Sequence, residues 1–216
     1  KPAYRIYREG IADKDIGAAE VMDSISPKTK IFHTGSLAIT PDQLGKVRRL
    51  LEMIKSKDIL ISIDLNIRLG AYPDVDSYLS GVKSLIPLAD IVKASDEDLQ
   101  HFSVASSPRD IAGSFYSEME SGIFILTEGA SGAIAYTSMG IAEAGARVVE
   151  DIEDTIGAGD TFHSGFLAAL IESQGSNFKK VFFDQSVIVR AMDFGAACAA
   201  LNLSKRGCNP PKRLEV

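Results

Sequence analysis

The sequence predicts an α/β protein whose doubly wound, mostly parallel sheet is flanked by helices. Short apolar segments typical of strands alternate along the chain with longer segments of helical periodicity, which is the pattern of repeated βα units. The chain has 216 residues, of which 45% are hydrophobic and 24% charged, enough to build one large core. No repeat or low-complexity linker interrupts the pattern.

The predicted elements follow one another from residue 31 onwards. Residues 31–34 predict a strand, residues 59–65 a second strand, and residues 41–57 between them an amphipathic helix. Thr40 suits the N-cap of this helix and Pro41 its first position. The remaining strands are predicted near residues 90–93, 123–128 and 132–137, and the remaining helices over residues 75–85, 96–102, 108–120, 158–172 and 180–202. Residues 3–8 alternate like a strand outside any βα unit, which alone is consistent with a solvated edge strand.

Composition excludes several classes of partner and site. The net charge of −6 comes without a basic stripe, which argues against a nucleic-acid partner. We find no apolar run of membrane-spanning length and no leader segment, so we expect no membrane partner and a cytoplasmic protein. Cys198 and Cys208 do not make a zinc set, and a reducing compartment is the simplest setting for them. We interpret His33, His101 and His163, which lie beside core or helix residues, as structural.

The segment Asp154 to Phe166, DTIGAGDTFHSGF, carries the most chemical information. Gly157 and Gly159 let the backbone turn sharply, so the amides of residues 158–160, beginning with Ala158, become the free donors at the start of a helix. These amides and the helix dipole favour a phosphate. Asp160, inside the same turn, is placed to take a proton from an attacking hydroxyl. A plain helix cap after a glycine turn is the alternative. No Lys follows the second glycine, which excludes a Walker-type loop.

This segment resembles the second signature of the ribokinase-like (PfkB) sugar kinase family. The resemblance implies that Asp160 is the catalytic base and that Gly157, Ala158 and Gly159 form the anion hole. The string ISIDLNIR is similar to the DxNxR motif of the fructokinase branch, which implies that Asp64, Asn66 and Arg68 bind the sugar. A surface salt bridge after a strand remains the alternative for these three residues.

Further segments resemble the nucleotide site of the family. IFILTEGASG, with Thr127, Gly129 and Gly132, is similar to the element that lies along the nucleotide phosphates. ADIVKASDEDL looks like the N-x-x-E motif, which implies nucleotide contacts for Lys93 and Ser95 and Mg²⁺ binding through water for Asp98. Ser95 replaces the frequent Asn and Asp98 the usual Glu, so Glu97 also remains a candidate. A helix N-cap explains the same residues without a metal.

The C-terminal string AACAALNLSKRGCNPP resembles the closing region that lies against the adenine, which implies nucleotide contacts for Asn202 and Gly207. Its small residues equally suit close helix packing. The resemblance also implies that Asp154 helps to hold K⁺, although a turn residue is the alternative reading of Asp154.

The resemblance divides the chain into residues 1–20, a remnant of a small β lid in which Arg5 and Tyr7 face the sugar, and residues 21–216, the nucleotide-binding and catalytic core. Family members are longer and carry a GG-containing sugar motif that has no counterpart before Lys1, so we expect a fragment or a truncated protein. Its unpaired sheet edges predict poor solubility or association, of which a homodimer is one form.

The sequence therefore predicts an ATP-dependent kinase that phosphorylates the primary hydroxyl of a sugar, most like the fructokinases, with ATP, Mg²⁺ and K⁺ as ligands. Two alternatives remain. One is a kinase for another small ligand, such as 2-keto-3-deoxygluconate, ribose or a nucleoside. The other is a remnant that binds nucleotide and transfers nothing. Because most of the lid is absent, we expect this chain alone to transfer phosphate slowly.

Overall fold

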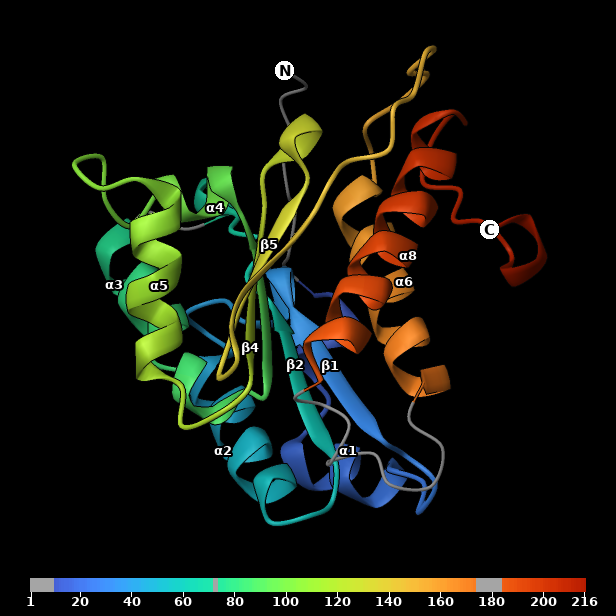
Figure 1. Cartoon of the computed structure of the whole chain (residues 1–216). Coiled ribbons are helices and arrows are strands. Elements are labelled where there is room, and N and C mark those ends of the chain that lie inside the picture. The colour runs from blue at the N-terminus through green and yellow to red at the C-terminus, as the bar shows by residue number, and fades with distance from the viewer. Residues whose placement is uncertain (1–9, 72–73, 174–183) are drawn as a thin grey trace.

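The computed structural model describes residues 10–71, 74–173 and 184–216, which form one six-stranded sheet with helices on both faces (Figure 1). The strands lie in sequential order, and the first four are parallel while the last two are antiparallel. They are β1 (Ile31–Gly35), β2 (Leu60–Asp64), β3 (Ile91–Ser95), β4 (Ile123–Thr127), β5 (Ala133–Thr137) and β6 (Gly140–Ala144). The predicted α/β fold with a mostly parallel sheet is confirmed.

Two helical layers cover this sheet (Figure 1). One layer contains α2 (Leu44–Lys55), α3 (Val75–Lys83) and α5 (Pro108–Glu118), together with the short α1 (Ala18–Ser24) and α4 (Asp96–Gln100). The other layer consists of α6 (Ala158–Ser173) and α8 (Gln185–Leu203), which pack against each other. Single 3₁₀ turns occur at Ala12–Lys14, Ser36–Ala38, Leu69–Ala71, Ile86–Leu88, Gly129–Ser131 and Arg213–Glu215.

The alternation of side chains along the strands decides which residues face each layer. In β2, Ile61 and Ile63 enter the core beneath α2, α3 and α5, whereas Leu60 packs on the side of α6 and α8. Ser62 and Asp64 share the side of Leu60, and Lys93 stands beside Asp64 in the register of β2 and β3. All five residues of β2, LISID, are buried, and its polar side chains therefore face α6. We call this side the α6 face of the sheet.

The structure corrects the predicted start of α2. The helix begins at Leu44, and Gln43 precedes it without a side-chain cap. Thr40 is fully buried, and its carbonyl accepts hydrogen bonds from the amides of Gln43 and Leu44, at 2.8 and 2.9 Å. The Thr40 hydroxyl meanwhile donates to Asp42 Oδ1 at 2.8 Å. Thr40 and Pro41 thus belong to a separate turn before the helix, because the turn itself satisfies the backbone groups that a cap would have served.

The helix α1 and the strand β6 were not predicted from the sequence, whereas the strands and helices predicted from residue 31 onwards are confirmed within a few residues. The prediction that no segment is long and apolar enough to span a membrane is wrong as far as length and composition are concerned. α8 meets that criterion over its 19 residues. One such helix is weak evidence for a membrane, and here its buried residues, including Ile188 and Met192, pack in the core with α6.

The predicted strand at residues 3–8 lies outside the described residues. The first described residues form a turn and the 3₁₀ turn Ala12–Lys14, after which α1 begins at Ala18. The predicted boundary between lid and core, at residue 20, falls inside α1 and stays a prediction.

Candidate active site

The carboxyl ends of the parallel strands and the first turn of α6 meet at one end of the molecule, where open α/β sheets place ligand sites. Asp160 stands in this first turn and is exposed. Gly157, just before the helix, has φ +75°, a left-handed conformation that favours glycine. The Thr161 amide closes the first helical bond to the Gly157 carbonyl at 2.8 Å. Ahead of it, the Ala158 amide donates to the Thr155 carbonyl at 3.4 Å, whereas the amides of Gly159 and Asp160 have no protein acceptor among the described residues and lie at the positive end of the helix dipole.

The surroundings of the two glycines of the turn leave little or no room for a side chain. A Cβ on Gly157 would collide with Cys208 Sγ, so any side chain there would displace the C-terminal loop. A Cβ on Gly159 would lie 3.1 Å from Lys93 Nζ. The lysine ammonium therefore sits against the same turn as the free amides. Together they form a cradle that is suited to an anionic phosphate.

The positive charge of Lys93 is paired with a carboxylate from the neighbouring strand. Its Nζ donates to Asp64 Oδ1 at 3.2 Å and to Oδ2 at 3.0 Å, and both side chains are about 95% buried. Burial raises the pKa of Asp64 to about 6, and the positive charge of Lys93 opposes this rise. The structure thus commits the Asp64 carboxylate to Lys93. The predicted sugar contact of Asp64 stays a prediction that this ion pair does not support.

Asp160 has one side-chain hydrogen-bond partner, which comes from the loop after β2. Asn66 Nδ2 donates to Asp160 Oδ1 at 3.3 Å, although the two residues are 94 positions apart in the sequence. Asn66 follows the end of β2 and has φ +37°, which is unusual for a residue with a side chain. One carboxylate oxygen of Asp160 is therefore held, while the other carries no protein hydrogen bond among the described residues. The arrangement suits a general base.

The structure describes the other residues that were predicted to bind the sugar less completely. Arg68 is exposed next to this loop, and its backbone amide donates to the Tyr78 hydroxyl at 3.4 Å. Arg5 and Tyr7 lie outside the described residues. The structure thus brings Asn66, but not a complete sugar-binding set, to Asp160.

The turn between β4 and β5 lies at the same end of the sheet as the turn before α6. Thr127 ends β4 with its hydroxyl 3.4 Å from the Ala94 carbonyl, and Gly129 and Gly132 have φ of +55° and +102°. A Cβ on Gly132 would overlap the Ala144 carbonyl, which explains the glycine structurally. The nucleotide contacts of Thr127, Gly129 and Gly132 stay predictions.

The acidic start of α4 is a complete capping box. Ser95 Oγ accepts from the Asp98 amide at 3.1 Å, while Asp98 Oδ2 accepts from the Ser95 amide at 2.9 Å and from Ser95 Oγ at 2.8 Å. The other oxygen, Oδ1, accepts from the amide of Ile67 at 2.7 Å. Asp98 is 6% exposed, whereas Glu97 is exposed to solvent. The capping alternative is thus present in the structure for Ser95 and Asp98.

The C-terminal loop is fastened to the segment before α6. Asp154 Oδ1 accepts from the Ile156 amide and Oδ2 from the Gly207 amide, both at 3.0 Å, and these bonds lower the pKa of Asp154. Asn202 is fully buried; its Nδ2 donates to the Ile156 carbonyl at 2.9 Å and its Oδ1 accepts from the Asn209 amide at 2.8 Å. The side chains of Asp154 and Asn202 thus form hydrogen bonds with backbone groups of the segment before α6 and of the C-terminal loop. The predicted nucleotide contact of Asn202 and cation contact of Asp154 stay predictions.

A polar group near Asp160, in which Ser62 and His163 are buried and His33 is exposed, was missed because its members were interpreted separately. Ser62 Oγ lies 2.8 Å from His163 Nε2 and 3.1 Å from His33 Nδ1, and the two imidazole rings are 4.8 Å apart. Burial lowers the pKa of His163 well below its ordinary value, so its ring is neutral. Its Nδ1 lacks a hydrogen-bond partner among the residues that the structure describes. The alternation of Ser62 with Asp64 in β2 was the available signal for this group.

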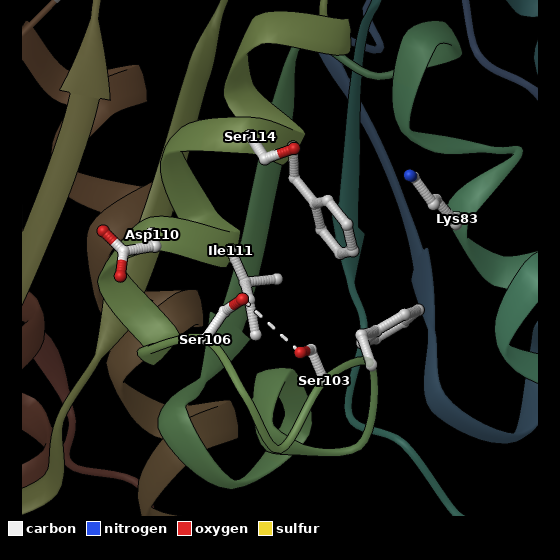
Figure 2. A pocket seen from close by; sticks show the side chains of 8 residues that line it. Lys83, Ser103, Ser106, Asp110, Ile111 and Ser114 are labelled. Atoms are coloured by element: carbon white, nitrogen blue, oxygen red, sulfur yellow. Dashed lines mark hydrogen bonds between the residues drawn. The ribbon is translucent and has the colours of Figure 1, made fainter.

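A separate pocket of about 260 Å³ opens between α3 and α5, in the layer away from α6 (Figure 2). Its charged groups already have partners. Lys83 pairs with Glu118 at 2.9 Å and stands over the Phe115 ring, and Asp110 accepts from Ser107 Oγ at 2.6 Å. Ser103 and Ser106 bond to each other across its rim at 3.4 Å. We assign no function to this pocket.

Comparison with known proteins adds a family. The model of the pfkB family of carbohydrate kinases matches residues 5–214. Among curated relatives, a probable fructokinase of Arabidopsis thaliana is 28% identical over 211 residues, and a fructokinase of Rhizobium leguminosarum bv. trifolii is 33% identical over 168. These alignments cover 96% and 77% of this chain, but only 62% and 50% of the relatives. The chain therefore spans between half and two thirds of their length.

Solved structures agree on the fold. A fructokinase from Xylella fastidiosa, solved with bound ATP, superimposes with a TM-score of 0.82 at 24% identity and covers 94% of this chain. An aminoimidazole riboside kinase from Salmonella enterica gives a TM-score of 0.74 at 23% identity over 89% of this chain. The chain covers 64% and 62% of these two proteins, respectively. At such identities the likeness concerns the fold alone.

Proposed function

The chain belongs to the pfkB family of carbohydrate kinases, and we propose that it transfers a phosphoryl group from ATP to a primary hydroxyl of a sugar. The observation that carries the proposal is the position of Asp160. It stands in the first turn of α6, after a glycine turn, and within hydrogen-bonding distance of Asn66. It directly follows Gly159, on which a Cβ would lie 3.1 Å from Lys93 Nζ. A base and an anion site thus share one turn.

We assign the chemistry as follows. The amides of Ala158, Gly159 and Asp160, with the Lys93 ammonium, bind and orient the terminal phosphate of ATP. The sugar hydroxyl loses its proton to Asp160, and its oxygen forms the new bond to that phosphorus. The bond between the phosphorus and the bridging oxygen breaks, and ADP leaves with the electron pair. The proton stays on Asp160 until product release.

The metal ions implied by the resemblance have no complete protein site here. No group of three or more His, Cys, Asp or Glu side chains gathers around a point in residues 10–71, 74–173 and 184–216. Both oxygens of Asp98 and both of Asp154 accept hydrogen bonds from protein donors. These side chains do not fit a direct Mg²⁺ or K⁺ site. Mg²⁺ commonly keeps its waters and binds substrate phosphates, so none of the steps above is assigned to a protein-bound metal.

Fructose is the acceptor that we propose first, because the curated relatives are named fructokinases. The alternatives are ribose, 2-keto-3-deoxygluconate and a nucleoside, and the fold neighbour named as a riboside kinase keeps the last of these open. The described site contains Asn66 and Arg68 but no complete sugar-binding set, so it does not discriminate among these acceptors.

The second candidate function is a nucleotide-binding remnant without transfer. The observation that favours it is that β1 pairs only with β2 among the described strands. In this alternative the cradle still binds phosphate, but no sugar is held near Asp160.

One experiment separates these functions. ADP release is measured with ATP and each of the four acceptors, and ATP binding is measured in parallel by calorimetry. The proposed function requires ADP release that depends on one of the acceptors. ATP binding without acceptor-dependent release supports the remnant, and absence of both contradicts the kinase proposal.

We further propose that residues 21–216 form the catalytic core, residues 1–20 belong to a lid, and the protein is cytoplasmic.

A further inference from the structure

A carboxylate outside the anion cradle connects to the predicted base through the backbone. A capping box needs only one oxygen of its acidic residue, and in α4 that oxygen is Asp98 Oδ2. The second oxygen, Oδ1, accepts from the Ile67 amide at 2.7 Å, 31 residues away in the sequence. Helix capping does not explain this second bond, because Ile67 belongs to the loop after β2.

Ile67 follows directly after Asn66, whose backbone is left-handed with φ +37°. Asn tolerates this conformation better than most residues with a side chain, and here the contacts of its two neighbours fix it. The amide of Leu65 donates to the Lys93 carbonyl at 2.9 Å, and the amide of Ile67 donates to Asp98 Oδ1. Both residues flanking Asn66 are therefore fixed to the segment formed by β3 and the start of α4. The buried side chains of Leu65 and Ile67 anchor them further.

The held conformation directs the Asn66 side chain to the site. Asn66 Nδ2 reaches Asp160 Oδ1 at 3.3 Å, which fixes one oxygen of the carboxylate. We propose that Asp98 is a positioning residue for Asp160: by holding the Ile67 amide, it keeps Asn66 in the left-handed conformation that orients the base. The inference rests on the proposed function, in which Asp160 accepts the proton of the sugar hydroxyl. In this inference Asp98 orders the loop after β2 and does not bind a metal.

The test is a double-mutant cycle on kcat for the best acceptor of the panel. Asp98→Asn keeps the size of the side chain but places an amide NH₂ where a second acceptor is needed, so one of its two contacts is lost. We expect kcat to fall about 10- to 100-fold, the usual range for a misplaced catalytic group. Asn66→Ala should lower kcat similarly. If Asp98 acts through Asn66, adding Asp98→Asn to Asn66→Ala should change kcat by less than about twofold.

Two controls separate positioning from capping and from metal binding. Ser107→Ala removes the N-cap hydroxyl of α5, outside the site, so it should lower thermal stability with kcat nearly unchanged. Asp98→Asn should leave the Mg²⁺ concentration for half-maximal rate unchanged. Independent, multiplicative effects of Asp98→Asn and Asn66→Ala, or a shifted Mg²⁺ midpoint, would overturn the inference.

A structural readout keeps the inference separate from the kinase proposal. Hydrogen exchange of the Ile67 amide should become faster in Asp98→Ala, which removes both acceptor oxygens, and remain slow in Ser95→Ala. Unchanged exchange at Ile67 in Asp98→Ala overturns the inference whatever the activity. Wild-type protein that releases no ADP with any acceptor instead overturns the proposed function, and with it the catalytic part of the inference.

Discussion

Lys93 Nζ lies 3.0 Å from Asp64 Oδ2 in the interior of the protein, on neighbouring strands and in direct register. Removing two charges from water is unfavourable, and a buried ion pair offsets that loss only partly. The pair is therefore weak evidence for stability. Its position beside Gly159 gives it another use, because Asp64 holds the Lys93 side chain next to the turn to which we assign the phosphate.

Lys93→Met should destabilise the protein by about 3–5 kcal/mol at pH 8, because it leaves the Asp64 carboxylate buried and unpaired. The double variant with Asp64→Asn should recover most of that loss. Urea unfolding of the single and double variants measures the difference. Equal stabilities of Lys93→Met and the double variant would mean that the unpaired carboxylate has no effect.

Asp64 also predicts a pH dependence of stability. Its pKa in the folded protein is about 6, above the ordinary value of 3.8, so between these values the folded state binds more protons than the unfolded state. Its contribution is complete below pH 3.8 and is lost as the pH rises through 6. Relative to Asp64→Asn, the wild-type free energy of unfolding should fall by about 3 kcal/mol between pH 3.5 and 7. A difference that is constant with pH would contradict the raised pKa.

The strands and most helices were predictable because hydrophobic periodicity and turn residues are local signals. β6 was missed because its sequence, GIAEA, has three small residues and only one strong strand former, Ile141. The start of α2 was misplaced because Thr40 has good capping chemistry but uses its carbonyl in a separate turn.

The site could be predicted only as a set of motifs. Asp160 and the glycine turn are contiguous in the sequence, so their association could be read directly. The pairing of Lys93 with Asp64 depends on the register of two strands, and the contact between Asn66 and Asp160 joins residues 94 positions apart. The sequence could not show that the amide of Asn202 is turned inward onto the Ile156 carbonyl and the Asn209 amide, and its nucleotide contact stays a prediction.

Asn202→Ala should destabilise the protein by about 2–4 kcal/mol, because the Ile156 carbonyl and the Asn209 amide would each lose a buried partner. ATP affinity should fall as well, since Ile156 precedes the glycine turn. Thermal unfolding and calorimetry test both expectations. Ser204→Ala, an exposed change at the end of the same helix, should alter stability by no more than about 0.5 kcal/mol.

Gly157→Ala should weaken ATP binding at least tenfold if the turn holds phosphate, because its Cβ would meet Cys208 and its φ of +75° disfavours a side chain. Adding Cys208→Gly should restore part of the affinity by removing the collision while the backbone strain remains. Gly45→Ala, in α2 with open space around it, is the control and should leave ATP binding unchanged. Wild-type affinity in Gly157→Ala would remove the turn from the nucleotide site.

Asp160→Asn tests the assignment of the base most directly. The amide keeps the size of the side chain and an oxygen that can accept from Asn66 Nδ2, so the site should remain assembled while the proton acceptor is lost. We expect acceptor-dependent kcat to fall by about a hundredfold or more and the calorimetric affinity for ATP to change only a few-fold. Asp76→Asn, an exposed change of the same charge in α3, should leave both values unaltered. If Asp160→Asn kept near-normal kcat, the proton would have to leave the hydroxyl by another route, and the central step of the proposed mechanism would be wrong.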